Sequence, residues 1–224
     1  MEHVVITGAD RGIGLALAEN FVRNGYTVYA GQFMPDWPQL GELQKQYPER
    51  LHIIPLNVGD NQSVKAAARM VASLTDRVDY LINCAGIFPK TEDADGFNSA
   101  FQVNSLGPLR MVEAFLPLMQ QGRKKLCTFS SETGVIPLMQ RVKDFPYCVS
   151  KAALNMATKT LHNKFKDDPK MNIICVHPGW MRTNEGNAKA PFDPYEHAET
   201  MRLLFEEKRH DKEGPIFVKE DLVW

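Results

Sequence analysis

Short apolar segments rich in β-branched residues alternate along the whole chain with longer segments of helical periodicity. A short segment of this composition is typical of a buried β-strand. We expect strands at Val4–Thr7, Thr27–Ala30, His52–Leu56, Tyr80–Asn83, Lys125–Ser130, Asn172–Val176 and Ile216–Val218. Because such strands are apolar on both faces, both faces must be covered. This favours parallel strands joined by helical crossovers.

The segments between these strands predict the covering helices. Apolar residues recur in them at helical spacing, and one side of each segment is polar. We expect helices at Ile13–Arg23, Ser63–Leu74, Phe97–Met119, Pro146–Phe165 and Pro194–Lys208. Right-handed crossovers then give an α/β fold with a doubly wound, seven-stranded parallel sheet and helices on both faces, the Rossmann arrangement.

A chain of 224 residues fits one domain, because two domains of ordinary size would be cramped. We expect a single nucleotide-binding domain over residues 1–224, with a substrate loop at about 180–193 and a short helix–strand tail. Asp60 and Asp193 stand where a carboxylate caps the start of a helix. Pro117 is expected to kink or end the central helix, since proline has no N–H to donate.

Composition excludes several classes of partner. Lys plus Arg is 26 and Asp plus Glu is 27, so no basic excess is available for nucleic acid. No apolar run approaches the roughly 18 residues that span a membrane, and the residues after Met1 show no secretory signal. Widely separated cysteines indicate reduced thiols rather than disulfides or a metal site. They are Cys84, Cys127, Cys148 and Cys175. We expect a cytoplasmic protein without a metal.

A glycine-rich turn follows the first expected strand directly. Gly8, Gly12 and Gly14 let the chain turn tightly, approach a pyrophosphate with its backbone and pack a helix close to the strand. The helix that begins there offers free N–H groups and partial positive charge to the phosphates. The alternative is a glycine-rich turn without a ligand. Its position at the first strand–helix junction of an alternating α/β chain favours dinucleotide binding.

These glycines open a pattern that resembles the short-chain dehydrogenase/reductase family. The matching motifs occur in the family's order between residues 3 and 183. They are Thr7-Gly8-x-x-x-Gly12-x-Gly14, Asn83-Cys84-Ala85-Gly86, Asn104, Ser130-Ser131, Tyr147-x-x-x-Lys151, and Pro178-Gly179 with Thr183. The tail is similar to that of the C-factor-like and sniffer-like carbonyl reductase branch. The resemblance implies an NAD(P)-dependent oxidoreductase that transfers a hydride between a nicotinamide and a carbonyl or secondary alcohol.

Tyr147 and Lys151 are the first pair of candidate catalytic residues. A tyrosine with its ordinary pKa of about 10 is a poor base near neutrality. Lys151 lies one helical turn on, so its ammonium can approach the phenol and lower that pKa in a partly dry cleft shared with the cationic nicotinamide of the oxidised coenzyme. The resemblance implies that Tyr147 gives the proton to the carbonyl oxygen, and that Lys151 also binds the nicotinamide ribose.

Ser131 and Asn104 complete the catalytic set that the resemblance implies. Ser131 would polarise the carbonyl with its hydroxyl, and Asn104 would bend the central helix and hold a water that leads to the lysine. Ser130 is the alternative to Ser131. The usual family spacing, about 13 residues before the tyrosine, falls on Gly134, which has no side chain. We therefore expect about three additional residues in Pro137–Phe145.

The resemblance also implies a set of coenzyme-binding residues. Gln32 stands where NAD-preferring relatives have an acid, and Arg11 resembles the basic residue that holds the 2′-phosphate of NADP. We therefore expect a modest preference for NADP, with NAD also used. The full set is Gly8, Asp10, Arg11, Gly12, Ile13, Gly14, Gln32, Asn57, Val58, Asn83, Ala85, Gly86, Tyr147, Lys151, Pro178, Gly179 and Thr183.

Mostly apolar side chains are expected around the substrate, which predicts an apolar or aromatic carbonyl compound. They are Phe88, Met139, Phe145, Trp180, Met181 and Phe192. The alternatives are a nucleotide-binding signalling or regulatory protein with little turnover, and a different reaction, such as epimerisation or dehydration, on the same fold. The retained serine, tyrosine and lysine argue against the first, and the short tail argues against the second.

The resemblance further implies a homodimer. In the family, the helices that carry the asparagine and the tyrosine commonly pair with their copies. Apolar residues of these two helices can supply such a face, although several must contact the sheet instead. They are Phe101, Met111, Phe115, Met119, Met156 and Leu161.

Overall fold

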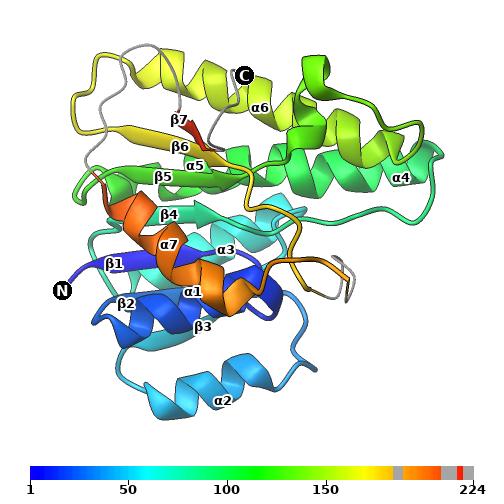
Figure 1. Ribbon diagram of the computed structural model, residues 1–224. Helices are drawn as coiled ribbons and strands as arrows, with labels where there is room; N and C mark the ends of the chain where they lie inside the picture. Colours follow the sequence, from blue (N-terminus) through cyan, green and yellow to red (C-terminus); the bar gives the residue numbers. More distant parts are fainter. Residues whose placement is uncertain (184–188, 208–215, 219–224) are drawn as a thin grey trace.

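The computed structural model describes residues 1–183, 189–207 and the backbone of 216–218. Seven parallel strands form one sheet in the order β3-β2-β1-β4-β5-β6-β7 (Figure 1). The strands are β1 His3–Ile6, β2 Thr27–Gln32, β3 Leu51–Pro55, β4 Tyr80–Asn83, β5 Lys125–Phe129, β6 Asn172–Val176 and β7 Ile216–Val218. This order is that of a doubly wound sheet, so the predicted fold class is confirmed.

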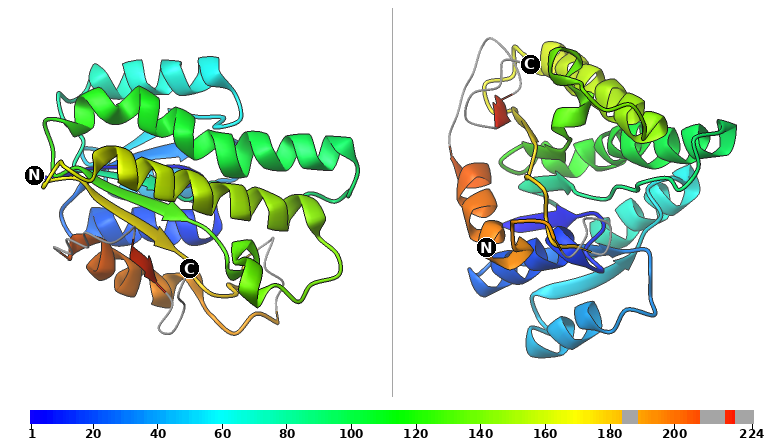
Figure 2. Two further views of the ribbon diagram at one scale, coloured as in Figure 1. Left: turned by 90° about the horizontal axis from the view of Figure 1, so that it is seen from above. Right: turned by 45° about the vertical axis from the view of Figure 1, so that its right-hand side comes forward.

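Helices cover both faces of the sheet. On one face lie α1 and α7, with α2 at the β2–β3 end. On the other face α3, α5 and α6 run side by side (Figures 1 and 2). The bounds are α1 Gly12–Arg23, α2 Gln39–Gln46, α3 Asn61–Ala72, α4 Ala94–Ala100, α5 Leu106–Met119, α6 Phe145–Phe165 and α7 Pro194–Glu206. Helix α2 was not expected from the sequence.

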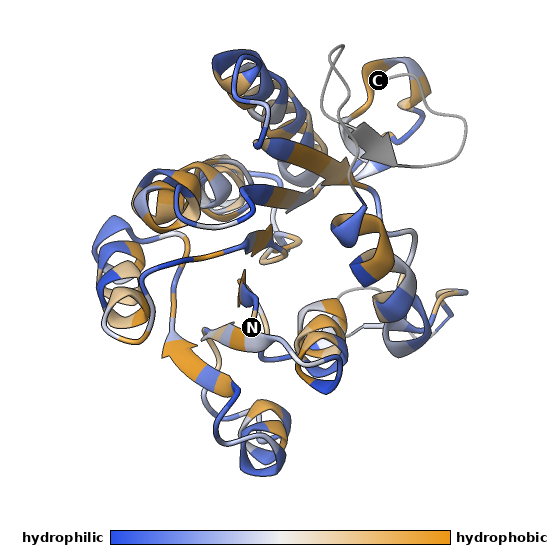
Figure 3. Ribbon diagram, turned by 90° about the vertical axis from the view of Figure 1, so that its left-hand side faces the viewer, coloured by the Kyte–Doolittle hydropathy of each residue, from blue (hydrophilic) through white to orange (hydrophobic). Residues whose placement is uncertain are grey.

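Two hydrophobic clusters fill the space on either side of the sheet. Val4 and Ile6 of β1 face the cluster under α1 and α7, whereas Val5 between them faces the cluster under α3 and α5. This alternation follows from the two-residue period of a strand. It also explains why apolar residues predominate in the strands, which show orange stretches beside shorter blue ones in Figure 3.

The helix boundaries follow local sequence signals. Asp60 accepts hydrogen bonds from the N–H groups of Gln62 and Ser63 at 3.0 and 3.2 Å, and so caps α3. The Asp193 carboxylate caps α7 in the same way. Both predicted caps are confirmed. Pro117 lies inside α5, and the helix ends two residues later, at Met119.

The tail helix α7 packs against α1 and the centre of the sheet. Arg202 donates from Nε to the Oδ1 of Asn20 at 2.8 Å. Phe205 is fully buried, with its ring 6.0 Å from that of Phe129 in an edge-on arrangement. The remainder of the expected tail, apart from β7, lies outside the described residues.

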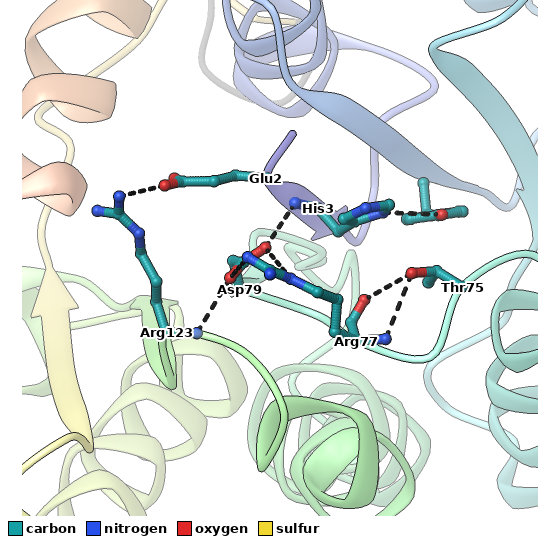
Figure 4. A network of polar contacts seen from close by, with 7 residues as sticks. Glu2, His3, Thr75, Arg77, Asp79 and Arg123 are labelled. Carbon is teal, nitrogen blue, oxygen red and sulfur yellow. Dashed lines mark hydrogen bonds and ion pairs between the residues drawn. The ribbon is translucent and has the colours of Figure 1, made fainter.

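A buried carboxylate ties strands together at the amino-terminal edge of the sheet. Asp79 is 0% exposed and accepts hydrogen bonds from the backbone N–H groups of His3 and Arg123, at 2.8 and 3.1 Å. The Arg77 guanidinium donates to both of its oxygens, at 2.7 and 3.2 Å (Figure 4). This network joins the start of β1 to the turn before β5. It lies on the edge opposite the predicted site.

Candidate functional site

The predicted site residues gather at the carboxyl edge of the sheet. The glycine-rich turn follows β1, the Asn83–Gly86 segment begins at the end of β4, Ser130 and Ser131 follow β5, and Pro178 follows β6. Because the strands are parallel, all four segments lie at one edge. Open α/β sheets bind ligands at this edge.

The glycine-rich turn lies too close to its neighbours for side chains. Gly8 has φ +65°, and a Cβ on it would lie 2.9 Å from the Cα of Ala85. A Cβ on Gly14 would lie 2.1 Å from the carbonyl oxygen of Gly8. Thr7 fixes this arrangement, because its Oγ1 accepts hydrogen bonds from the N–H groups of Cys84 and Ala85, at 3.0 and 2.9 Å. Each predicted glycine role thus has a steric cause.

The start of α1 has the properties of a phosphate-binding site. Arg11 precedes the helix in an extended conformation and makes no capping hydrogen bond with its side chain. Gly12, with φ +57°, and Ile13 follow it in the first turn. A helix of this kind offers its first N–H groups and its dipole to an anion.

Among the described residues, Asp10 and Trp37 hold the Arg11 side chain in place. Its Nη1 lies 3.2 Å from the Oδ2 of buried Asp10, and its guanidinium carbon lies 5.4 Å from the centre of the Trp37 ring. Trp37, in the loop after β2, was not predicted to contribute. Gln32, the last residue of β2, is partly exposed. Arg11 and Gln32, the two residues expected to select between NADP and NAD, therefore lie at the ends of the neighbouring strands β1 and β2.

Among the residues predicted to lie beside the adenosine, Asn83 has a buried side-chain amide without a hydrogen-bond partner in the described part of the chain. Both amide atoms of Asn83 are buried without a hydrogen-bond partner among the described residues. The Oδ1 of Asn57 accepts from the N–H of Gly59 at 2.9 Å, which forms a turn. Val58 is buried against Gly107, where a Cβ would lie 3.0 Å from its Cγ2. An unpaired buried amide is unusual, and it is consistent with a ligand that completes its hydrogen bonds.

Lys151 is almost completely buried near the middle of the site. Its Nζ lies 5.7 Å from the centre of the Tyr147 ring, one turn earlier on α6. Burial lowers the pKa of Lys151 to about 8. Burial also raises the pKa of both nearby thiols, Cys84 and Cys175, to about 12. These cysteines are therefore neutral at pH 7 and do not balance the lysine charge.

The Tyr147 phenol lies between an aromatic ring and a hydroxyl. The Phe88 ring is 4.7 Å from the Tyr147 ring. Burial raises the pKa of Tyr147 above its ordinary value, while a hydrogen bond with Ser131 lowers it. The pKa of Tyr147 rises because desolvation of the phenolate outweighs the favourable contacts that the protein's own groups make with it.

Ser131 and Ser130 have different surroundings. The Oγ of Ser131 accepts a hydrogen bond from the N–H of Thr133 at 3.2 Å and lies 3.0 Å from the Thr133 hydroxyl. Ser130 instead donates to the Oδ1 of Asn155. A Cβ on Gly134 would lie 2.6 Å from the carbonyl carbon of Lys151, so Gly134 packs directly on α6. Of the two serines, Ser131 is thus the one hydrogen-bonded to the tyrosine.

Asn104 lies in a π-helical turn, Phe101–Ser105, between α4 and α5. Its side chain is fully buried: Nδ2 donates to the Ile87 carbonyl at 2.9 Å and to the Ser150 hydroxyl at 3.0 Å, and Oδ1 accepts from the Ile87 N–H. Pro108 has no N–H, so the Asn104 carbonyl lacks its regular α-helical donor. This geometry is compatible with the water-holding role that was predicted.

The segment after β6 folds over the glycine-rich turn. Gly179 has φ +87°, and a Cβ on it would lie 2.8 Å from the Phe192 ring. Thr183 contacts Gly12, where a Cβ would lie 3.1 Å from its Cγ2. Of the expected substrate-lining residues, Met181 is buried and pairs with Phe192 in an isolated β-bridge. The others are partly or largely exposed: Phe88, Met139, Phe145, Trp180 and Phe192.

Three residues near the site were missed in the sequence: Thr133, Asn155 and Trp37. Asn155 could have been found, because it follows Tyr147 by two helical turns and Lys151 by one.

In the described part of the chain, no His, Cys, Asp and Glu side chains are grouped to hold a metal ion. No described helix is both long and apolar enough to cross a membrane.

Comparison with known proteins decides the family. A sequence model described as short chain dehydrogenase matches residues 2–192. The chain belongs to the short-chain dehydrogenase family. The expected resemblance is thereby confirmed, and this short-chain dehydrogenase is an NAD(P)-dependent oxidoreductase.

Individual relatives agree with this assignment. An uncharacterized oxidoreductase of Schizosaccharomyces pombe is 34% identical over 188 residues, which are 80% of this chain and 73% of that protein. The NADPH-bound carbonyl reductase from chicken fatty liver has a TM-score of 0.86 at 27% identity, over 97% of this chain and 96% of that one. The carbonyl reductase Sniffer of D. melanogaster shares the fold, with a TM-score of 0.88 at 24% identity over 97% of this chain and 96% of that one.

Proposed function

We propose that this short-chain dehydrogenase transfers a hydride between a nicotinamide coenzyme and a carbonyl or secondary alcohol on an apolar small molecule. One observation carries the proposal. The Ser131 hydroxyl is close enough to the Tyr147 phenol to lower its pKa, and the buried ammonium of Lys151 lies 5.7 Å from the centre of the Tyr147 ring, at the ligand-binding edge of the sheet. A proton donor, a polarising hydroxyl and a cation are therefore within reach of one bound oxygen.

Each side chain has a definite task in this proposal. Ser131 accepts a hydrogen bond from its own loop, so its proton is available to the Tyr147 phenol or to a bound substrate oxygen. Tyr147 donates a proton to that oxygen during reduction and receives one during oxidation. Lys151 stabilises the phenolate that forms, and Asn104 keeps the segment around Ile87 against α6. When bound, the coenzyme supplies or accepts the hydride.

The residues present fit a dinucleotide. The crowded glycines leave backbone N–H groups at the start of α1 as the surface for the pyrophosphate, and the unpaired Asn83 amide is available beside β4. Gly86 keeps open the space near Lys151, since a Cβ there would lie 3.7 Å from Nζ. We propose the remaining holders as Asp10, Arg11, Gln32, Asn57, Val58, Ala85, Pro178, Gly179 and Thr183.

The character of the substrate is inferred from the rim of the site. Phe88, Phe145, Trp180 and Phe192 are all partly exposed, and Phe88 lies directly against Tyr147. Large exposed aromatic rings around a polar centre favour an aromatic or aliphatic carbonyl compound over a sugar. The likeness to the chicken carbonyl reductase supports this class.

We also propose a homodimer formed by α5 and α6, in the cytoplasm. Met111, Phe115 and Met119 are buried against the sheet and are not available for this face. Met156, which is 69% exposed, and Val149 on the same helix remain available. Light scattering is expected to give twice the monomer mass, and a concentration-independent monomer would refute the dimer.

Coenzyme oxidation with a panel of aldehydes, ketones and diketones tests the activity, and Tyr147→Phe tests the mechanism. This variant loses only the phenol hydroxyl, so we expect kcat to fall by about 10²- to 10⁴-fold while the coenzyme Kd stays within about twofold. Retention of most activity would refute the mechanism. Tight coenzyme binding without turnover of any carbonyl would instead favour the regulatory alternative.

A further inference from the structure

Asn155 lies on the same face of α6 as the tyrosine and lysine of the site. It follows Lys151 by one helical turn and Tyr147 by two, so the three side chains form a row. Lys151 donates to the Phe129 carbonyl at the end of β5, whereas Asn155 is directed at the loop after β5. That loop carries Ser131.

The Asn155 amide holds this loop at two points. Its Oδ1 accepts a hydrogen bond from the Ser130 hydroxyl, and its Nδ2 donates to the carbonyl oxygen of Gly134 at 3.1 Å. Ser130 directly precedes Ser131. Gly134 closes the short turn after Ser131, because the Gly134 N–H donates to the Ser131 carbonyl at 3.0 Å. Both ends of the segment that carries the Ser131 hydroxyl are therefore bonded to one side chain of α6.

Close packing makes the position of this segment depend on α6. A Cβ on Gly134 would lie 2.6 Å from the backbone of Lys151 and 2.8 Å from the Nδ2 of Asn155. The loop thus rests on the helix without an intervening side chain. Since Tyr147 is on the same helix, any shift of the loop along α6 changes the distance between the Ser131 hydroxyl and the phenol.

We propose that Asn155 is a positioning residue for the reaction, which holds the Ser131 hydroxyl in register with Tyr147. The proposal rests on the proposed roles of these two residues. A hydroxyl polarises a carbonyl effectively only when it is positioned to within a few tenths of an ångström, because the strength of a hydrogen bond falls steeply with distance and with misalignment. Asn155 contacts neither substrate nor coenzyme in this role.

Asn155→Leu is the first test, because leucine has a similar volume but no hydrogen-bonding group. We expect kcat to fall about tenfold or more, while the KM for the coenzyme stays within about twofold. The alkaline shift of the pH profile for alcohol oxidation is the second readout. Because the hydrogen bond from Ser131 lowers the pKa of Tyr147, its loss moves the pKa of the base upward.

Thr158→Val is the matched control. Thr158 is buried on the same helix, and its hydroxyl donates to the Leu154 carbonyl in the turn before it rather than to the loop that carries Ser131. This variant is expected to leave both kcat and the pH profile unchanged. If Asn155→Leu lowers thermal stability and coenzyme binding to the same extent as kcat, without a shift in the pH profile, its role is structural and the proposal is overturned.

Two further variants keep the test decisive if Asn155→Leu folds poorly. Ser130→Ala removes one of the two contacts and is expected to lower kcat less, by about threefold, with the same direction of pH shift. Ser131→Ala separates this proposal from the proposed function. If Ser131→Ala stays fully active, the polarising role and the positioning role both fail. If Ser131→Ala is inactive and Ser130→Ala and Asn155→Leu keep full kcat, only the positioning role fails.

Discussion

Lys151 donates a hydrogen bond from its Nζ to the carbonyl oxygen of Phe129, 2.8 Å away. The lysine thus crosses from α6 to the end of β5, where it is only 5% exposed. Its ammonium has exchanged water for one carbonyl and a largely apolar environment, which is why burial lowers its pKa to about 8 from an ordinary 10.5. The protein therefore loses stability in order to hold a charge at this point.

Lys151→Met is expected to stabilise the protein at pH 7. A pKa that falls from 10.5 to about 8 corresponds to roughly 3 kcal/mol. Loss of the hydrogen bond to Phe129 offsets about 1 kcal/mol of this, so a net gain of about 2 kcal/mol in unfolding free energy remains. Denaturant titration measures it, and activity is expected to be lost.

The pH dependence of this gain has a definite sign. Between about pH 8 and 10.5 the unfolded chain keeps the Lys151 proton that the folded protein has released, so the stability of the wild type rises with pH relative to the variant. The difference is therefore greatest below pH 8 and is largely gone by pH 10.5. A variant that is less stable than the wild type at pH 7 would show that the buried ammonium is well solvated.

Gly134→Ala is expected to impair both stability and catalysis. The new methyl group would lie 2.6 Å from the backbone of Lys151, so the loop that carries Ser131 must move away from α6. We expect a loss of about 1–3 kcal/mol, typical of overpacking, and a fall in kcat of at least tenfold. Thermal unfolding and steady-state kinetics measure the two effects.

Gly41→Ala is the control for that substitution. Gly41 lies within α2, and a Cβ there would have no neighbour within 4 Å. Alanine is the better helix former, so we expect stability to rise by about 0.5–1 kcal/mol with unchanged activity. Equal behaviour of the two variants would contradict the close packing between Gly134 and α6.

The sequence was sufficient for the fold because its signals are local. Apolar strands, the caps at Asp60 and Asp193, and the glycine-rich turn each depend on residues close together in the chain. Helix α2 was missed because Gln39–Gln46 has only two buried leucines and is otherwise polar. The segment Trp180–Pro191 has little periodicity, so its path could not be predicted beyond a loop.

The contacts within the site could not be predicted to the same depth. The distance from Ser131 to Tyr147 depends on a loop that reaches α6 only in the folded protein, as does the clamp by Asn155. The burial that raises the pKa of Tyr147 was not predicted from the sequence either. Burial is a property of the whole fold, whereas the helical spacing of Lys151 suggested only the opposing charge effect.

Asp79→Asn tests whether the amino-terminal edge of the sheet is independent of the site. The substitution replaces a buried carboxylate that accepts from Arg77 and from two backbone N–H groups, so we expect a loss of about 2–4 kcal/mol in unfolding free energy. Because the network in Figure 4 lies opposite the predicted site, kcat and the coenzyme KM are expected to stay within twofold.

Asp76→Ala is the control for Asp79→Asn. Asp76 is an exposed acid three positions earlier, and its removal is expected to change stability by less than about 0.5 kcal/mol. A fall in kcat with Asp79→Asn at temperatures where the protein is folded would instead reveal coupling across the sheet.

Arg11→Ala tests the proposed coenzyme preference. Gln32 carries no charge that would repel the 2′-phosphate of NADP, and Arg11 supplies a cation in the glycine-rich turn. Asp10 and the Trp37 ring hold the guanidinium from two sides, which limits the freedom it loses when it binds a phosphate. We expect kcat/KM with NADPH to fall about tenfold in Arg11→Ala and kcat/KM with NADH to change by less than twofold.

Trp37→Leu separates orientation of Arg11 from its charge. This variant keeps the guanidinium but removes the ring on which it stacks, so we expect a smaller loss with NADPH, about threefold, and again little change with NADH. Steady-state kinetics measure kcat/KM for NADPH and for NADH in both variants. Equal losses with NADPH and NADH in Arg11→Ala would mean that Arg11 only supports the glycine-rich turn. A wild-type preference for NADH of tenfold or more would contradict the role assigned to the neutral Gln32.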